Sequence, residues 1–195
     1  MSALLYGLLG FGCIVLYDIN NTAHNNDRMQ SLYVVGAGLI GLAFASYVFP
    51  GMEKSSAVPA AVRIVTGVLA GVSFLLLVYV SLFTGGRTNW KRRESKGSAD
   101  RWWEKELVTT GAYALCRHPS VWLMFFLSML LVPAAGFPLL YAAAYSLIGL
   151  LLAVYEDINV FPVLMRGYDS YKKTTPFLFP TRESIRLCFN GKKGK

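Results

Sequence analysis

The sequence predicts an all-α integral membrane protein, a helical bundle with about five transmembrane helices. Three observations carry this prediction. Of the 195 residues, 54% are hydrophobic and only 15% are charged. The apolar residues come in long blocks. Apolar and polar residues do not alternate as they would in the strands of a β-barrel. Because backbone polar groups in lipid must be satisfied within their own segment, each block is expected to form a helix.

Five apolar blocks are candidate spans. A helix that crosses a bilayer needs roughly 20 apolar residues. They cover residues 3–17, 31–49, 59–83, 119–135 and 137–155. The first block is short, but it lacks a basic leader and no small-residue cleavage site follows it. We therefore expect a retained helix rather than a signal peptide.

Small residues recur at every fourth position in two of these blocks. The second block has Ala37, Gly41 and Ala45, and the third has Gly67 and Gly71. Such a spacing is typical of membrane helices that approach one another closely, so it predicts helix packing.

The chain is expected to form one integral membrane domain over 1–195. Residues 1–83 hold three spans, and residues 84–118 form a basic connector. Residues 119–155 are predicted to form a helical hairpin around the short turn "VPAAGFP", and residues 156–195 a C-terminal segment.

Lys and Arg residues are divided unequally between the two predicted membrane faces. Of 19 such residues, one lies in 18–30, eight lie in 84–118 and eight follow residue 156. Only Lys54 and Arg63 fall on the other face. The positive-inside rule therefore predicts an outside N-terminus and a cytoplasmic C-terminal tail. Basic residues beside anionic lipid account for the net charge of +8 without a nucleic acid partner.

Two polar clusters lie at the predicted membrane boundary. Arg117 and His118 precede Pro119, which suits the first position of a helix because it lacks an N–H group. Glu156 and Asp157 directly follow an apolar span, where the helix dipole disfavours acidic groups. The hairpin brings both clusters to one end. Each has a structural alternative, a helix start for the first and an ion pair with Arg117 or a connector base for the second.

A metal site is not expected. Cys13, Cys116 and Cys188 are scattered, and neither His24 nor His118 has a further ligand at a suitable spacing.

Two segments resemble a known family. "ELVTTGAYALCRHPS" resembles the "LVTTGPYxxxRHPxY" signature of the isoprenylcysteine carboxyl methyltransferase and phospholipid methyltransferase superfamily. "EDINVFPVLMRGYDSYKKTTPFLFP" resembles the tail of that family, with its acidic pair, its tyrosines (Tyr168 and Tyr171) and its prolines (Pro176 and Pro180). The resemblance covers residues 106–180.

The resemblance implies an S-adenosylmethionine-dependent methyltransferase whose active site lies at the cytoplasmic membrane boundary. In this family the acidic pair holds the ammonium group of the cofactor, which assigns Glu156, with Asp157 beside it. His118 and Arg117 take the catalytic positions, and His118 is the candidate base if the acceptor is an amine. The implied cofactor-binding residues are Leu107, Val108, Gly111, Tyr113, His118, Pro119, Glu156 and Asp157.

The chain departs from the family pattern at several positions. Ala112 replaces a proline, Val121 a tyrosine, Leu123 a glycine, and Asp157 a glutamate. Residues 151–154 lack the arginine that isoprenylcysteine enzymes carry before the acidic pair, which disfavours a carboxylate acceptor.

The acceptor is therefore left open among a prenylated cysteine, an aminophospholipid and a small apolar thiol. Membrane lipids are the expected surroundings, and no obligate protein partner is evident. Two other functions are retained. The departures would suit a non-enzymatic membrane protein with a decayed pocket, and sterol reductases that use NADPH share a related C-terminal architecture but are far longer.

Overall fold

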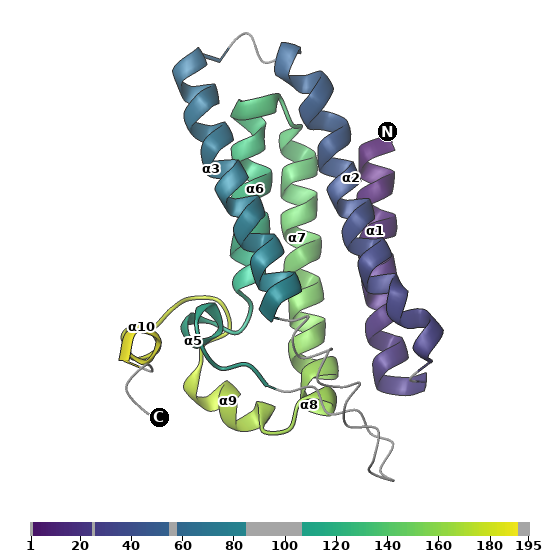
Figure 1. The fold of residues 1–195 in the computed structure, drawn as a ribbon, viewed down its shortest axis with the longest axis vertical. Helices are drawn as coiled ribbons and strands as arrows, with labels where there is room; N and C mark the ends of the chain where they lie inside the picture. The colour runs from purple at the N-terminus through teal and green to yellow at the C-terminus, as the bar shows by residue number, and fades with distance from the viewer. Residues whose placement is uncertain (1, 25, 55–57, 85–106, 191–195) are drawn as a thin grey trace.

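The computed structural model describes residues 2–24, 26–54, 58–84 and 107–190. These residues form helices and no strand (Figure 1). The longer helices are α1 (Ser2–Ile19), α2 (Ser31–Lys54), α3 (Ala60–Val78), α6 (Pro119–Ala135), α7 (Leu139–Tyr155) and α10 (Arg182–Asn190). Shorter helices are η1 (Asn20–His24), η2 (Asp27–Gln30), η3 (Tyr79–Thr84), α5 (Ala112–Leu115), η4 (Glu156–Val160), α8 (Phe161–Leu164) and α9 (Tyr168–Thr174). Most of the predicted basic connector lies outside the described residues.

Four helical stretches are long and apolar enough to cross a membrane. They are Ala3–Ala23, Arg28–Val48, Ala60–Ser81 and Leu139–Leu164. The remaining predicted span forms α6 at its predicted bounds, but its 17 residues extend over only about 25 Å. A hydrocarbon core is about 30 Å thick. The predicted all-helical class is thus confirmed, with four helical stretches that are long and apolar enough to cross a membrane and one shorter apolar helix.

The two ends of the bundle differ. The start of α1, the end of α2, the start of α3 and the α6–α7 turn lie towards one end, while α5, α8, α9 and α10 gather at the other (Figure 1). The described parts of the polar segments that the sequence analysis assigns to one membrane face therefore share one end of the bundle.

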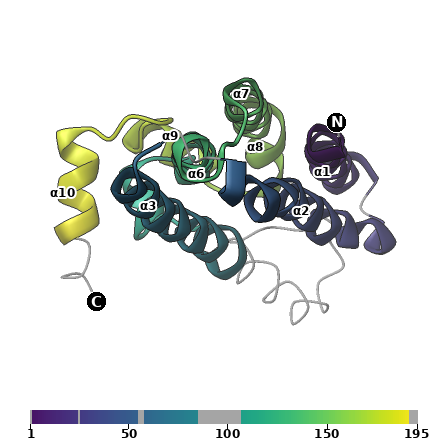
Figure 2. The same cartoon turned by 90° about the horizontal axis from the view of Figure 1, so that it is seen from above.

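The bundle is organised around α6, which packs against α2, α3 and α7 (Figure 2). Its neighbour α7 carries Tyr145, which is fully buried and whose ring packs edge-on against Phe44 of α2. The Tyr145 hydroxyl donates a hydrogen bond of 2.6 Å to the Ala3 carbonyl, which joins the start of α1 to α7. A buried tyrosine needs such a partner for its hydroxyl.

Close helix contact occurs between α1 and α2, at glycines other than those predicted. A Cβ atom added to Gly36 would lie 2.7 Å from the Gly10 carbonyl oxygen, so only glycine fits there. By contrast, a Cβ at Gly41 or Gly71 would meet no atom within 4 Å. The prediction that Gly41 and Gly71 mediate close packing is therefore wrong, because no neighbouring helix approaches them.

The predicted hairpin of α6 and α7 is present. Gly136 ends α6 in the left-handed region with a φ of 64°, a conformation that glycine adopts readily. The N–H groups of Gly136 and Phe137 donate to the carbonyls of Val132 and Leu131, so the last turn of α6 is satisfied. Three residues then suffice to reverse the chain before Leu139.

Helix α10 lies to one side, across the long axis of the bundle (Figures 1 and 2). Ser184 is buried and the Cys188 thiol contacts the Gly111 carbonyl at 3.4 Å, so one face packs on the segment around α5. Ile185 and Phe189 remain 42% and 77% exposed. This orientation, perpendicular to the membrane-type helices, is that of a helix in the plane of a membrane surface.

Candidate functional site

The Arg117-His118 pair forms an extended corner between α5 and α6. Pro119 occupies the first position of α6, and His118 has a φ of −124° and a ψ of 64°, outside the helical region as predicted. The backbone N–H of Arg117 donates to the Pro176 carbonyl at 2.9 Å, and that of His118 donates to Phe177 at 3.2 Å. The C-terminal segment thus holds this corner through backbone bonds.

Asp157 is the centre of the side-chain network. Arg117 donates to both of its carboxylate oxygens, from Nε to Oδ1 at 2.8 Å and from Nη2 to Oδ2 at 3.1 Å. The Tyr168 hydroxyl donates to Oδ1 at 2.6 Å, and Lys172 Nζ lies 3.1 Å from Oδ2. A bidentate arginine–carboxylate pair is among the stronger geometries. Asp157 is only 5% exposed, so these donors compensate the loss of hydration.

The adjacent Glu156 has a different environment. Both acids lie in the π-helical turn η4, where consecutive side chains leave the helix in different directions. It is the Asp157 carboxylate that meets Arg117. Glu156 Oε2 lies 3.9 Å from His118 Nδ1, and the Glu156 side chain is 20% exposed.

His118 is buried between aromatic rings. Its ring stacks on Phe161 at 5.6 Å between centroids and lies 4.9 Å from the ring of Phe177. Its Nε2 atom is 3.4 Å from Asp157 Oδ1. Burial lowers the pKa of His118 to about 4, although the nearby Asp157 carboxylate opposes this change. His118 is therefore neutral at pH 7.

Tyr113 joins the surroundings of Glu156. Burial, followed by the charges of Tyr33 and Glu156, raises the pKa of the Tyr113 phenol, so these three groups lie close enough to interact. The Tyr171 hydroxyl donates to the Tyr113 carbonyl and holds α5 against α9. Glu156 thus lies within electrostatic range of two phenol groups, and the His118 ring lies beside it.

Leu107 and Gly111, also predicted to bind the cofactor, line a separate cavity of about 790 Å³ with α9 and α10. Val108 is half-buried and does not line it. Gly111 has a φ of 63° and a ψ of −131°, a conformation that is essentially restricted to glycine. The structure therefore places His118 beside Glu156, with Tyr113 within electrostatic range of that acid, while Leu107 and Gly111 line the other cavity.

Several residues of the site were not predicted as site residues. Tyr168 stands out in the sequence only for its spacing from Tyr171. Lys172 lies one helical turn after Tyr168 in α9. Phe177 lies between the two tail prolines, a position that indicates a fixed extended segment. Tyr33, near the start of an apolar block, carries no sequence signal of its own.

The fold and this cluster define a helical membrane-type protein with a buried ionic network at one end of its bundle. Comparison of the chain with protein-family models, curated proteins and solved structures finds no match. Within the described ranges, no group of three or more His, Cys, Asp or Glu side chains could hold a metal ion.

Proposed function

We propose that this chain is a membrane-embedded S-adenosylmethionine-dependent methyltransferase that acts on a lipid-like or small apolar acceptor. One observation carries the proposal. The two segments that resemble the methyltransferase family meet in one buried cluster, through the bidentate bond between Arg117 and Asp157, 40 residues apart. Separate backbone bonds from Arg117 and His118 to the tail join the same two segments.

The residues around Glu156 suit a cationic ligand group. A carboxylate that is partly exposed can form a charge-assisted hydrogen bond with an ammonium group. The rings of Tyr33 and Tyr113 offer faces that attract a cation. In this proposal Glu156 holds the ammonium of the cofactor, with Tyr113 and His118 beside it.

Asp157 acts as a positioning residue. Its oxygens already accept bonds from Arg117, Tyr168 and Lys172, so it orients the corner before α6 rather than contacting the ligand. In this proposal Glu156 binds the ligand and Asp157 has a structural role.

When bound, S-adenosylmethionine supplies a methyl group that is already activated, so the chain must orient the acceptor and exclude water. A neutral His118 with a pKa of about 4 is a weak base. This disfavours an amine acceptor, which must lose a proton, whereas a thiol is already partly ionised near neutral pH. Residues 151–154 offer no arginine for a carboxylate. Of the three acceptor classes, these features favour a small apolar thiol.

The proposed topology follows from the arrangement of the ends. Eight Lys and Arg residues lie in 84–118 and eight more after residue 156, and the described parts of both segments lie at the end of the bundle that holds Arg117. The positive-inside rule then makes this end cytoplasmic and the N-terminus external, with α6 as the fifth span.

Calorimetric titration of S-adenosylmethionine into the detergent-solubilised chain tests the function. We expect binding by the wild type and about ten- to a hundredfold weaker binding by Glu156→Gln, which loses a charge-assisted bond. The loss of cofactor affinity should exceed any change in the melting temperature of the ligand-free chain. NADPH serves as the control ligand and is expected not to bind.

A second candidate, a non-enzymatic membrane protein, is favoured by the saturated bonding of Asp157. For this candidate neither ligand binds, and Glu156→Gln lowers only the melting temperature. Absence of S-adenosylmethionine binding by the folded wild type would overturn the methyltransferase proposal.

A further inference from the structure

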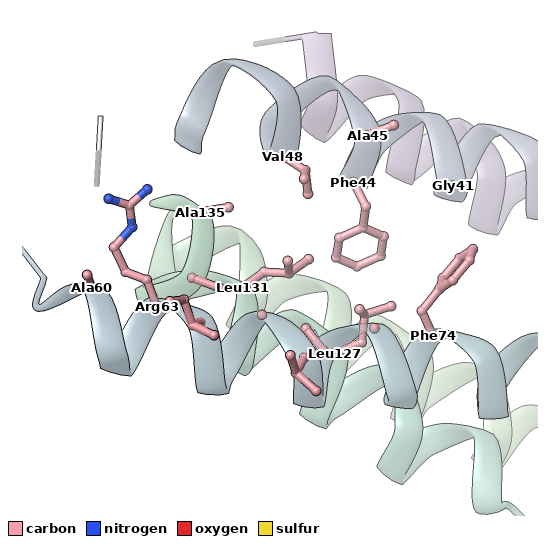
Figure 3. A pocket seen from close by; sticks show the side chains of 16 residues that line it. Gly41, Phe44, Ala45, Val48, Ala60, Arg63, Phe74, Leu127, Leu131 and Ala135 are labelled. Carbon is pink, nitrogen blue, oxygen red and sulfur yellow. The ribbon is translucent and has the colours of Figure 1, made fainter. Parts of the chain in front are cut away.

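A second hollow runs along the bundle from its middle towards the end opposite the Arg117–Asp157 pair. It is a groove of about 800 Å³ between α2 and α3, with α6 as its floor (Figure 3). Phe44, Phe74, Leu127 and Leu131 contribute apolar surface to it. Because Leu131 is near the end of α6 and Pro119 at its start, the groove is distinct from the candidate functional site.

Small residues create this groove. Gly41 and Gly71 line it from opposite walls, and a Cβ atom added to either would meet nothing within 4 Å. At Gly67 an added Cβ would reach only Ala134, at 4.0 Å. Where this protein uses glycine for helix contact, as at Gly36, the neighbouring backbone lies directly opposite. The glycines of the groove instead leave space open along the two helices.

The groove has a charged end. Arg63 is the one charged residue among the described residues that line it, and it lies in the first turn of α3 beside Ala60 (Figure 3). The N-terminus of α3 adds a positive partial charge at the same end. A guanidinium group has five N–H donors, so it can bind a phosphate alongside other contacts. The remaining lining is apolar, with only small residues or hydrocarbon and aromatic side chains.

We propose that this groove binds one anionic phospholipid, with an acyl chain between α2 and α3 and the phosphate at Arg63. In a bilayer the space faces hydrocarbon rather than water, so a linear apolar chain is the occupant that matches its lining. The cation at the interfacial end matches a lipid phosphate in charge and depth. A helix of a second copy would match the apolar walls, but it would place no anion at Arg63.

Native mass spectrometry of the full chain tests the proposal. The chain in detergent is incubated with phosphatidylglycerol and phosphatidylcholine that carry identical acyl chains. We expect the wild type to retain one phosphatidylglycerol in preference to phosphatidylcholine. Arg63→Gln should reduce this preference about fivefold, the effect of one basic residue near a lipid surface.

A matched glycine pair locates the site. Gly41→Leu fills the groove and should reduce retention of either lipid at least about tenfold, because its side chain occupies the space of the acyl chain. Gly38→Leu is the control. It lies in the same helix, outside the lining, and an added Cβ there also meets nothing within 4 Å. Melting temperatures establish that both variants fold.

Three results would overturn the proposal. Equal lipid retention by Gly41→Leu and wild type would show that the lipid does not bind in the groove. If the wild type retained phosphatidylglycerol and phosphatidylcholine equally, and Arg63→Gln did the same, Arg63 would not select the headgroup. A dimer that Gly41→Leu dissociates, with no retained lipid, would make a second copy of the chain the occupant. The test needs no methyl transfer, so it is independent of the proposed function.

Discussion

Arg117 and Asp157 bond through two parallel contacts, at 2.8 and 3.1 Å, although 40 residues separate them in the sequence. Asp157 follows α7 and Arg117 precedes α6, so this pair closes the open end of the helical hairpin. The side chains of Asp157 and Arg117 are only 8% and 10% exposed, respectively. A buried pair of this kind leaves an uncompensated charge when one partner is removed.

Asp157→Asn is therefore expected to destabilise the protein. Loss of the charge leaves Arg117 and Lys172 without their shared anion and should cost about 3–5 kcal/mol. Thermal melts in detergent measure the effect. Asp169→Asn, in the exposed first turn of α9, is the matched control and should cost less than about 1 kcal/mol. Similar melting temperatures for the two variants would contradict a structural role of Asp157.

Gly111→Ala tests the backbone before α5. The residue has a φ of 63°, where a side chain is strained whatever space surrounds it, so the variant should lose about 1–3 kcal/mol. Gly12→Ala, inside α1 and also without neighbours within 4 Å, should instead gain a few tenths to 1 kcal/mol. Opposite shifts in melting temperature are expected, and equal shifts would contradict the conformational explanation.

The stability of the protein should fall in mild acid because of His118. Burial holds its pKa at about 4 in the folded chain, against a value near 6.5 for an exposed histidine. Between these values the unfolded chain binds more protons, so the free energy of unfolding rises with pH. The free energy of unfolding should be highest above about pH 6.5, decrease as the pH falls towards 4, and then level off. The total decrease due to His118 should be about 3 kcal/mol.

His118→Gln isolates this contribution, since all other side chains are the same in both chains. Melting temperatures from pH 4 to pH 8 should show a shallower slope for the variant. Parallel curves would mean that another group causes the acid sensitivity.

Helix α10 is expected to rest in the membrane surface. Ile185 and Glu183 lie on nearly opposite sides of the helix. Single spin labels at these positions, in a chain whose three cysteines are replaced, report their surroundings. In lipid nanodiscs the label at 185 should be more accessible to oxygen, and the label at 183 to a water-soluble nickel complex. Equal accessibility to the nickel complex would place α10 in water.

The orientation of the bundle can be measured with a membrane-impermeant maleimide on intact cells. Pro59→Cys, at the start of α3, should be labelled from outside, and Asp169→Cys, in α9, only after permeabilisation. Both variants use the chain without native cysteines. The reverse pattern would invert the proposed topology.

The sequence alone determined where the apolar helices lie along the chain and, for α6, also its limits. Residues 119–135 were predicted as a span and form α6 at those bounds, because Pro119 can begin a helix and Gly136 can end one. The departure of His118 from helical geometry also follows from local chemistry, since the next residue is proline. These features depend on neighbours in the chain, which the sequence displays directly.

The tertiary structure alone decided which of two adjacent acids meets Arg117. Glu156 and Asp157 carry the same charge, and only the direction of the η4 turn relative to α6 selects Asp157. The spacing of small residues likewise could not predict which glycines lie at helix contacts. Gly36 and Gly41 are both helical glycines, yet one faces a backbone and the other an open groove. A glycine in the sequence specifies that a side chain is missing, whereas the placement of the other helices determines what occupies the space.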